Sequence, residues 1–223
     1  MNKNMTLKEA LFELINENVL IDFDERNESI ELVETNDGNQ THTQEKKKTL
    51  LNSVTIIGIK SEDFIIAFKP DTDRFRFLGN LIKTKKEGDE KSRKPIKKSC
   101  DGIIFCKIKG VHYILVVELK SEKRNSLQEK YKAVKLFLTF LNETLKMYYD
   151  IEKNFTVINI LFDRNLKSGK PRFLPAPSER EKNIQIYFQQ GFNKPQENKT
   201  RIERILDALN EEIKGNNDIT YLN

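Results

Sequence analysis

The stretch that decides the fold reads Asp101-Gly-Ile-Ile-Phe-Cys-Lys-Ile-Lys-Gly110-Val-His-Tyr-Ile-Leu-Val-Val-Glu118-Leu-Lys120. Its two apolar runs, residues 103–108 and 113–117, are joined through Gly110. A glycine between two short apolar runs indicates a β-hairpin. The second run is almost continuously apolar, which is typical of a strand covered on both faces. We therefore expect a hairpin whose second strand is buried in a sheet.

Charged side chains mark one end of this hairpin. Glu118 and Lys120 are two residues apart, so alternation along a strand places them on the same face, where we expect the core to give way to solvent. Asp101 opens the preceding strand, and an antiparallel hairpin brings the start of one strand beside the end of the next. Two carboxylates and one ammonium are thus expected to converge, and such a cluster can hold a divalent cation and a water.

Composition sets the broad class of protein. The chain has 223 residues, which fits a single domain, residues 1–223, with an N-terminal helix and a polar insertion over about residues 1–53. Hydrophobic residues make up 37% of the chain and charged ones 33%, but the apolar residues are gathered in runs, so the chain is expected to fold. The net charge of +5 favours a polyanionic partner without requiring one.

The absence of a long apolar run and the small number of cysteines indicate where the protein is expected to work. No run of about 18 apolar residues occurs, so no membrane span is expected. The two cysteines, Cys100 and Cys106, are too few and wrongly spaced for a zinc cage. We expect Cys106 to pack in the sheet and the protein to work in a reducing cytoplasm.

Helix signals occur at three places. Thr6 followed by Glu9 predicts a capped opening helix of about three turns. Ser126 can cap a long helix that ends near Tyr149, and residues 200–213 carry apolar positions at helical spacing.

Strand signals surround the central hairpin. Residues 54–59 and 64–68 predict a second hairpin, and residues 155–162 and 184–188 predict two further strands. A helix between the strand that ends at Glu118 and residues 155–162 makes a βαβ unit with parallel strands. Residues 74–78 alternate arginine and phenylalanine, which fits an ordinary two-faced strand or a basic face for phosphates.

This element order, with Asp101, Glu118 and Lys120 at their places in it, resembles the PD-(D/E)XK nuclease superfamily. Cys100 stands where the proline of that name would be. The resemblance implies an α/β restriction-endonuclease-like fold, in which helices flank a mixed central sheet. The acid-x-Lys pattern alone is common in this chain, so the signal is the buried strand that Glu118 and Lys120 terminate.

The resemblance also implies a function and its cofactor. It implies a Mg²⁺- or Mn²⁺-dependent nuclease that hydrolyses phosphodiester bonds, with DNA ahead of RNA as substrate and a role in restriction or anti-phage defence. It leaves open a homodimer or a partner protein in a defence complex. Asp101 and Glu118 would hold the cation with the carbonyl of Leu119, because Mg²⁺ prefers oxygen ligands. Lys120 would lie against the metal-bound water and lower its pKa.

Nucleic-acid contacts are expected beside this site. The segment 83–98 is mainly basic and leads directly to Asp101, so Lys94, Lys97 and Lys98 are candidates for phosphate contacts, although a solvated loop fits the same pattern. Gln128 lies where a helix glutamine occurs in parts of the superfamily. Tyr131 falls near it but also fits the apolar stripe of the helix.

Two other interpretations stay open at this point. Glu118 and Lys120 fit a partly exposed ion pair at a strand end, and the chain then fits a catalytically inactive nucleic-acid-binding or assembly subunit that keeps the fold. Other enzyme classes find little support. His42 and His112 lie in a loop and at a turn, which disfavours a catalytic triad, and no phosphate-binding glycine loop precedes a helix.

Overall fold

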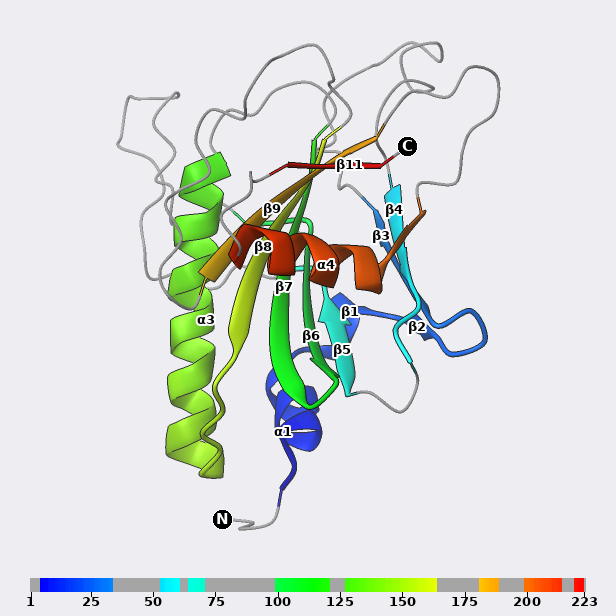
Figure 1. The fold of residues 1–223 in the computed structure, drawn as a ribbon. Coiled ribbons are helices and arrows are strands. Elements are labelled where there is room, and N and C mark those ends of the chain that lie inside the picture. Colours follow the sequence, from blue (N-terminus) through cyan, green and yellow to red (C-terminus); the bar gives the residue numbers. More distant parts are fainter. Residues whose placement is uncertain are drawn as a thin grey trace, which may run out of the picture.

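A computed structural model describes residues 5–33, 53–60, 64–70, 99–120, 127–163, 181–188, 199–213 and 219–222. For residues 120, 128, 163, 181–188, 208–213 and 219–222 it describes the backbone alone. The predicted strand 74–78 and the predicted basic loop 83–98 lie outside the described residues. The described chain is mixed α/β, with two mixed sheets and few helices (Figure 1).

The larger sheet has seven strands, and its central hairpin is the one that the sequence predicts. Antiparallel pairing joins the strands from β1 to β7, and parallel pairing joins β7, β8, β9 and β11. In spatial order the strands are β1 (Leu20–Ile21), β5 (Ile65–Phe68), β6 (Gly102–Ile108), β7 (Val111–Lys120), β8 (Thr156–Asp163), β9 (Glu181–Phe188) and β11 (Ile219–Leu222).

The turn of the central hairpin has two residues. Lys109 and Gly110 both have positive φ, 50° and 82°, as the tight hairpin turns whose twist matches that of the strands require. The pairing then runs from Ile108 opposite Val111 to Gly102 opposite Val117. The predicted hairpin is thus confirmed, and its register decides which residues meet at the far end.

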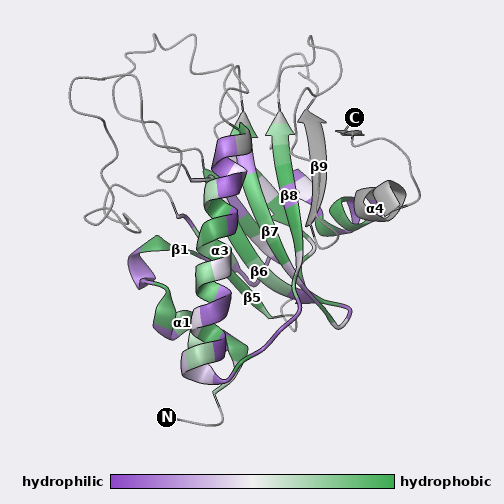
Figure 2. Cartoon of the chain, turned by 90° about the vertical axis from the view of Figure 1, so that its left-hand side faces the viewer, coloured by the Kyte–Doolittle hydropathy of each residue, from purple (hydrophilic) through white to green (hydrophobic). Residues whose placement is uncertain are grey.

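The predicted βαβ unit is also confirmed. The long helix α3 (Leu127–Tyr149) connects β7 to β8, which lie parallel. The cap predicted at Ser126 lies outside the described residues. Helix α3 and the opening helix α1 (Leu7–Leu14) cover the same face of the large sheet (Figure 2). At the start of α1 the predicted capping box is present: Glu9 N donates to Thr6 Oγ1 at 3.3 Å and Thr6 N donates to Glu9 Oε2 at 2.7 Å.

The second sheet corrects the prediction for residues 54–68. Strand β4 (Ser53–Ile57) pairs with β3 and β10, whereas β5 pairs with β1 and β6, so the predicted hairpin between β4 and β5 is wrong. The chain leaves β4 through Gly58, whose φ of 81° is a conformation that glycine adopts readily. The four strands, in spatial order, are β10 (Lys199–Arg201), β4, β3 (Ser29–Val33) and β2 (Phe23–Asp24).

The core has two layers. One layer packs α1 and α3 against the large sheet and includes Phe105, Val116 and Leu161. The other lies between the two sheets and the helix α4 (Ile202–Ile213), which is the closing helix that the sequence predicts, and it includes Leu119. Side chains alternate between the two faces along a strand, so at the end of β7 the even-numbered residues point toward α3 and the odd-numbered ones toward the second sheet. No helix in the described part of the chain is long and apolar enough to cross a membrane.

Candidate active site

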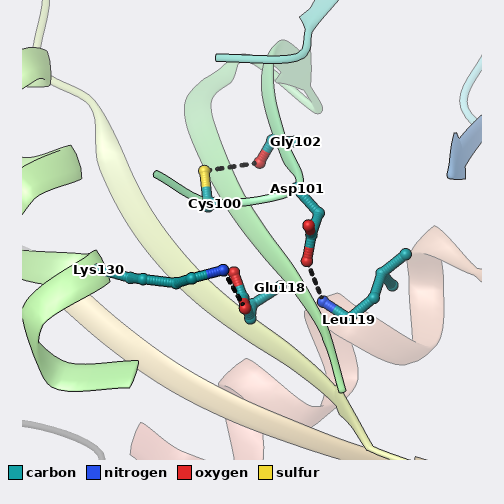
Figure 3. A network of polar contacts seen from close by, with 6 residues as sticks. All are labelled: Cys100, Asp101, Gly102, Glu118, Leu119 and Lys130. Atoms are coloured by element: carbon teal, nitrogen blue, oxygen red, sulfur yellow. Dashed lines mark hydrogen bonds and ion pairs between the residues drawn. The ribbon is translucent and has the colours of Figure 1, made fainter. Parts of the chain in front are cut away.

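Asp101 and Glu118 meet at one end of the central hairpin. The strand pairing ends at Gly102 opposite Val117, so Asp101 and Glu118 are the next residues along the two strands. Asp101 N donates to Val117 O at 3.0 Å, and Leu119 N donates to Asp101 Oδ2 at 2.7 Å (Figure 3). A side-chain carboxylate therefore accepts the Leu119 N–H, which fixes the Asp101 side chain at the end of the ladder. Asp101 is itself buried, with 6% of its surface exposed.

Glu118 lies deeper than the sequence predicts. Its exposed fraction is 0%, so the expectation that the core gives way to solvent at Glu118 is wrong. The physical reason is that β7 continues to Lys120 with β8 alongside it, while α3 packs on the face toward which Glu118 points. A partly exposed ion pair at a strand end, the simpler interpretation of this residue, does not fit such burial.

The partner of Glu118 is a lysine of the helix. Lys130 Nζ lies 2.6 Å from Glu118 Oε1, and Figure 3 shows the lysine reaching from α3 toward the end of β7. The Lys130 side chain is 18% exposed. An ionised carboxylate that is removed from water is strongly unfavourable unless it is paired and hydrogen-bonded, so this ion pair is one of the contacts that permit Glu118 to stay charged there.

Shifts in pKa show that the charges of this cluster act on one another. Burial alone would lower the pKa of Lys130, but attraction by Glu118 and Asp101 outweighs burial and the pKa is raised. The pKa of Cys100 is raised by burial and then by the negative charges of Glu118 and Asp101. The same causes, with Cys100 added, raise the pKa of the Tyr131 hydroxyl. The lysine therefore stays protonated, and the thiol and phenol stay neutral.

Tyr131 and Cys100 are two buried residues on which the charges of Glu118 and Asp101 act. Tyr131 is 4% exposed and packs in the layer beneath α3, as its place in the apolar stripe indicates. Within the described residues its hydroxyl has no hydrogen-bond partner. Cys100 is fully buried, and its Sγ donates to Gly102 O at 3.4 Å. A buried hydroxyl without a hydrogen-bond partner is unusual and reduces the stability of the fold.

The structure brings some predicted site residues to one end of the hairpin, and it does not describe the side chains of the others. Asp101, Glu118 and Leu119 are adjacent at the end of the hairpin. The backbone of Lys120 pairs with Asp163 of β8, but its side chain is not described. Gln128 belongs to α3, and its side chain is likewise not described. Lys94, Lys97 and Lys98 lie outside the described residues.

Sequence reasoning missed Lys130, although the sequence contains a signal for it. Leu127, Tyr131 and Val134 form the buried stripe of α3, and Lys130 falls on that same stripe, three residues after Leu127 and four before Val134. A lysine within an apolar stripe requires either a route to solvent or a buried acid. Glu118, at the end of a buried strand, was the acid available.

The two carboxylates suit a hard cation. A carboxylate has about four lone-pair positions, so a contact such as that of Leu119 N with Asp101 Oδ2 or of Lys130 Nζ with Glu118 Oε1 does not by itself exhaust its capacity for ligands. Oxygen donors of this kind are the ligands that Mg²⁺ and Mn²⁺ prefer. Among the residues that the structure describes, no group of three or more His, Cys, Asp or Glu is arranged to hold a metal ion. Among the described residues, the acidic side chains available to a cation here are those of Asp101 and Glu118.

Comparison with known proteins does not assign the chain to a family. No protein-family model matches it, and neither a curated protein nor a solved structure is significantly similar to it.

Proposed function

We propose that this chain is a metal-dependent nuclease with a restriction-endonuclease-like fold. The observation that carries the proposal is the presence of two buried acids, Asp101 and Glu118, at the same end of a hairpin in a mixed sheet, directly before a βαβ crossover. Buried acids at a strand end reduce stability unless they are compensated, so their presence favours a functional role.

The side chains have separate tasks in this proposal. Asp101 and Glu118 would hold a divalent cation, with the carbonyl of Leu119 as a further oxygen ligand. When bound, Mg²⁺ or Mn²⁺ would supply a Lewis acid for a phosphate oxygen and a more acidic bound water. The Leu119 N–H keeps Asp101 in place, and Lys130 Nζ pairs with Glu118 Oε1. Lys120, which directly follows Leu119 in the sequence, would stabilise and orient the attacking water by its charge.

The substrate and setting follow from charge and from the resemblance. The net charge of +5 and the basic segment 83–98, which leads into Asp101, favour a polyanionic substrate. The proposed substrate is DNA, ahead of RNA, and the proposed role is restriction or anti-phage defence in the cytoplasm. A homodimer or a complex with a partner protein would be compatible with cleavage of both strands.

A second candidate function is favoured by one observation. Glu118 is fully buried and its Oε1 is already held by Lys130 at 2.6 Å, an arrangement that can serve structure alone. The chain would then be a catalytically inactive nucleic-acid-binding or assembly subunit, in which segment 83–98 contacts the nucleic acid.

Plasmid cleavage separates the two functions. Purified protein is incubated with plasmid DNA and Mg²⁺ or Mn²⁺, beside the variants Asp101→Asn, Glu118→Gln and Lys120→Met. The isosteric amides are preferred to alanine because both acids are buried. Lys107→Met is the matched control, since Lys107 is an exposed lysine of the same hairpin.

The nuclease proposal predicts nicking by the wild type and by Lys107→Met, and no cutting by the other three variants although they still bind DNA. Binding without cutting by every form, with either metal, would favour the inactive subunit.

A further inference from the structure

We propose that Lys130 competes with the divalent cation for Glu118, so that its ammonium is a built-in cation of the metal-free site. This inference deepens the proposed nuclease function, on which the identity of the site rests. It concerns a helix residue that is neither part of the hairpin nor of the acid-x-Lys pattern. The ammonium and the dication would act on the same buried carboxylate, and each would weaken the binding of the other.

The argument begins with the position of the charge. Glu118 is 0% exposed and lies 2.6 Å from Lys130 Nζ, within the range of a strong, charge-assisted hydrogen bond. Such burial leaves the carboxylate little access to bulk water, so protein groups or a bound ion must supply its compensation. Lys130 supplies one unit of positive charge at Oε1, one of the two oxygens with which Glu118 would bind a metal.

The second step concerns the balance of charge. Asp101 and Glu118 together carry two negative charges, and Lys130 reduces the sum of these three residues to minus one. A dication that binds Glu118 must also approach the ammonium, because Lys130 Nζ lies 2.6 Å from Glu118 Oε1. Like charges a few ångströms apart repel strongly where water is excluded. Removal of the ammonium should therefore strengthen binding of the dication.

The third step concerns the lysine's freedom to leave. Its side chain is 18% exposed, so the ammonium has a route toward solvent while the carboxylate has none. A long, flexible side chain can swing its ammonium outward and keep its apolar stem on the core. The ion pair can thus open when a dication arrives, without any displacement of the strand that carries Glu118.

Binding of Mn²⁺ to the folded full-length protein tests this inference without any nuclease assay. Free Mn²⁺ is measured by electron paramagnetic resonance for the wild type, Lys130→Met and Lys130→Gln. The glutamine variant keeps a hydrogen-bond donor for Glu118 and guards against loss of folding. We expect both variants to bind Mn²⁺ roughly tenfold or more tightly than the wild type, and we expect the gain to vanish in Glu118→Gln/Lys130→Met.

Lys146→Met is the matched control. Lys146 lies on the same helix and pairs with Glu152 at 3.1 Å, but both side chains are exposed, by 52% and 76%. Its loss should leave the Mn²⁺ affinity unchanged. A folded Lys130 variant with wild-type or weaker Mn²⁺ affinity would overturn the inference. So would a failure of both Lys130 variants to fold even with Mn²⁺ present, because the dication should then replace the ammonium.

The outcome is separable from that of the nuclease proposal. Wild-type protein that cuts plasmid while the Lys130 variants show no gain in Mn²⁺ affinity would refute the inference alone. A gain in Mn²⁺ affinity in a protein that never cuts nucleic acid would support the inference and refute the nuclease.

Discussion

Replacing Lys130 by methionine should destabilise the metal-free fold by about 3 kcal/mol. Methionine preserves much of the apolar stem but removes the ammonium that lies 2.6 Å from the fully buried Glu118. Breaking a buried ion pair by removal of one partner costs about 3–5 kcal/mol because a charge is left uncompensated. We take the lower end because Lys130 keeps 18% of its side chain exposed, so water can reach the vacated position.

A double-mutant cycle measures this pair directly. Urea unfolding with EDTA present is followed by circular dichroism for the wild type, Lys130→Met, Glu118→Gln and the double variant. Each single change should lower the free energy of unfolding, and the double variant should lose less than the sum, by at least about 1 kcal/mol. Lys146→Met, whose lysine is exposed, should unfold close to the wild type. A Lys130→Met variant as stable as the wild type, or a strictly additive double variant, would refute the reasoning.

The contribution of Lys130 should also depend on pH in one direction. Burial lowers the pKa of Lys130, but the negative charges of Glu118 and Asp101 raise it by more than burial lowers it. The pKa in the folded protein therefore lies above the ordinary value of 10.5. A group with a raised pKa stabilises the fold fully below its unfolded value and loses that contribution as the pH rises through the folded value. The difference in unfolding free energy between wild type and Lys130→Met should therefore be constant from about pH 6 to 9 and shrink above 10.5.

Three further predictions concern the surroundings of the site. Gly102→Ala should cost about 1–3 kcal/mol, because a Cβ there would lie 2.5 Å from the buried Leu32 Cδ2, and Leu32→Val should relieve part of that cost in a urea-unfolding cycle. Tyr131→Phe should leave the unfolding free energy unchanged or raise it, since its hydroxyl has no hydrogen-bond partner within the described residues; a loss above about 1 kcal/mol would reveal a bound partner. Cys100 and Cys106 are both buried and should react with a thiol reagent only after unfolding, so a rapidly labelled native thiol would contradict their placement.

The central part of the fold was predictable because its signals are local. The hairpin is encoded by two apolar runs and a glycine turn, and α3 by a long periodic stripe. The parallel pairing of β7 with β8 followed from their connection through a helix. Within the site, the placement of Asp101 and Glu118 at the same end of the hairpin follows from the same strand pairing. These are contacts between neighbours in sequence or between elements joined by one connection.

The second sheet was not predictable from local pattern. Strand β10 has only three residues, and it pairs Arg201 with Ile57, residues far apart in the chain. Strand β3 lies in a polar region, with Glu31 between its buried Ile30 and Leu32, so it carries too short an apolar signal to stand out. Hairpin pairing of β4 with β5 was the natural inference for neighbouring strands, but β4 is held by partners that only the tertiary structure brings to it.

Lys130 and Glu118 explain each other in a way that neither sequence segment does alone. A lysine on the buried stripe of α3 would be strongly unfavourable without an acid, and Glu118 at the end of a buried strand would be equally unfavourable without a cation. Both charged residues interrupt a buried apolar pattern, and they lie twelve residues apart across one βα connection. Their ion pair accounts for both interruptions together. The same ion pair has a testable consequence. Because Lys130 compensates the charge of Glu118, a metal ion that binds Glu118 must compete with the Lys130 ammonium.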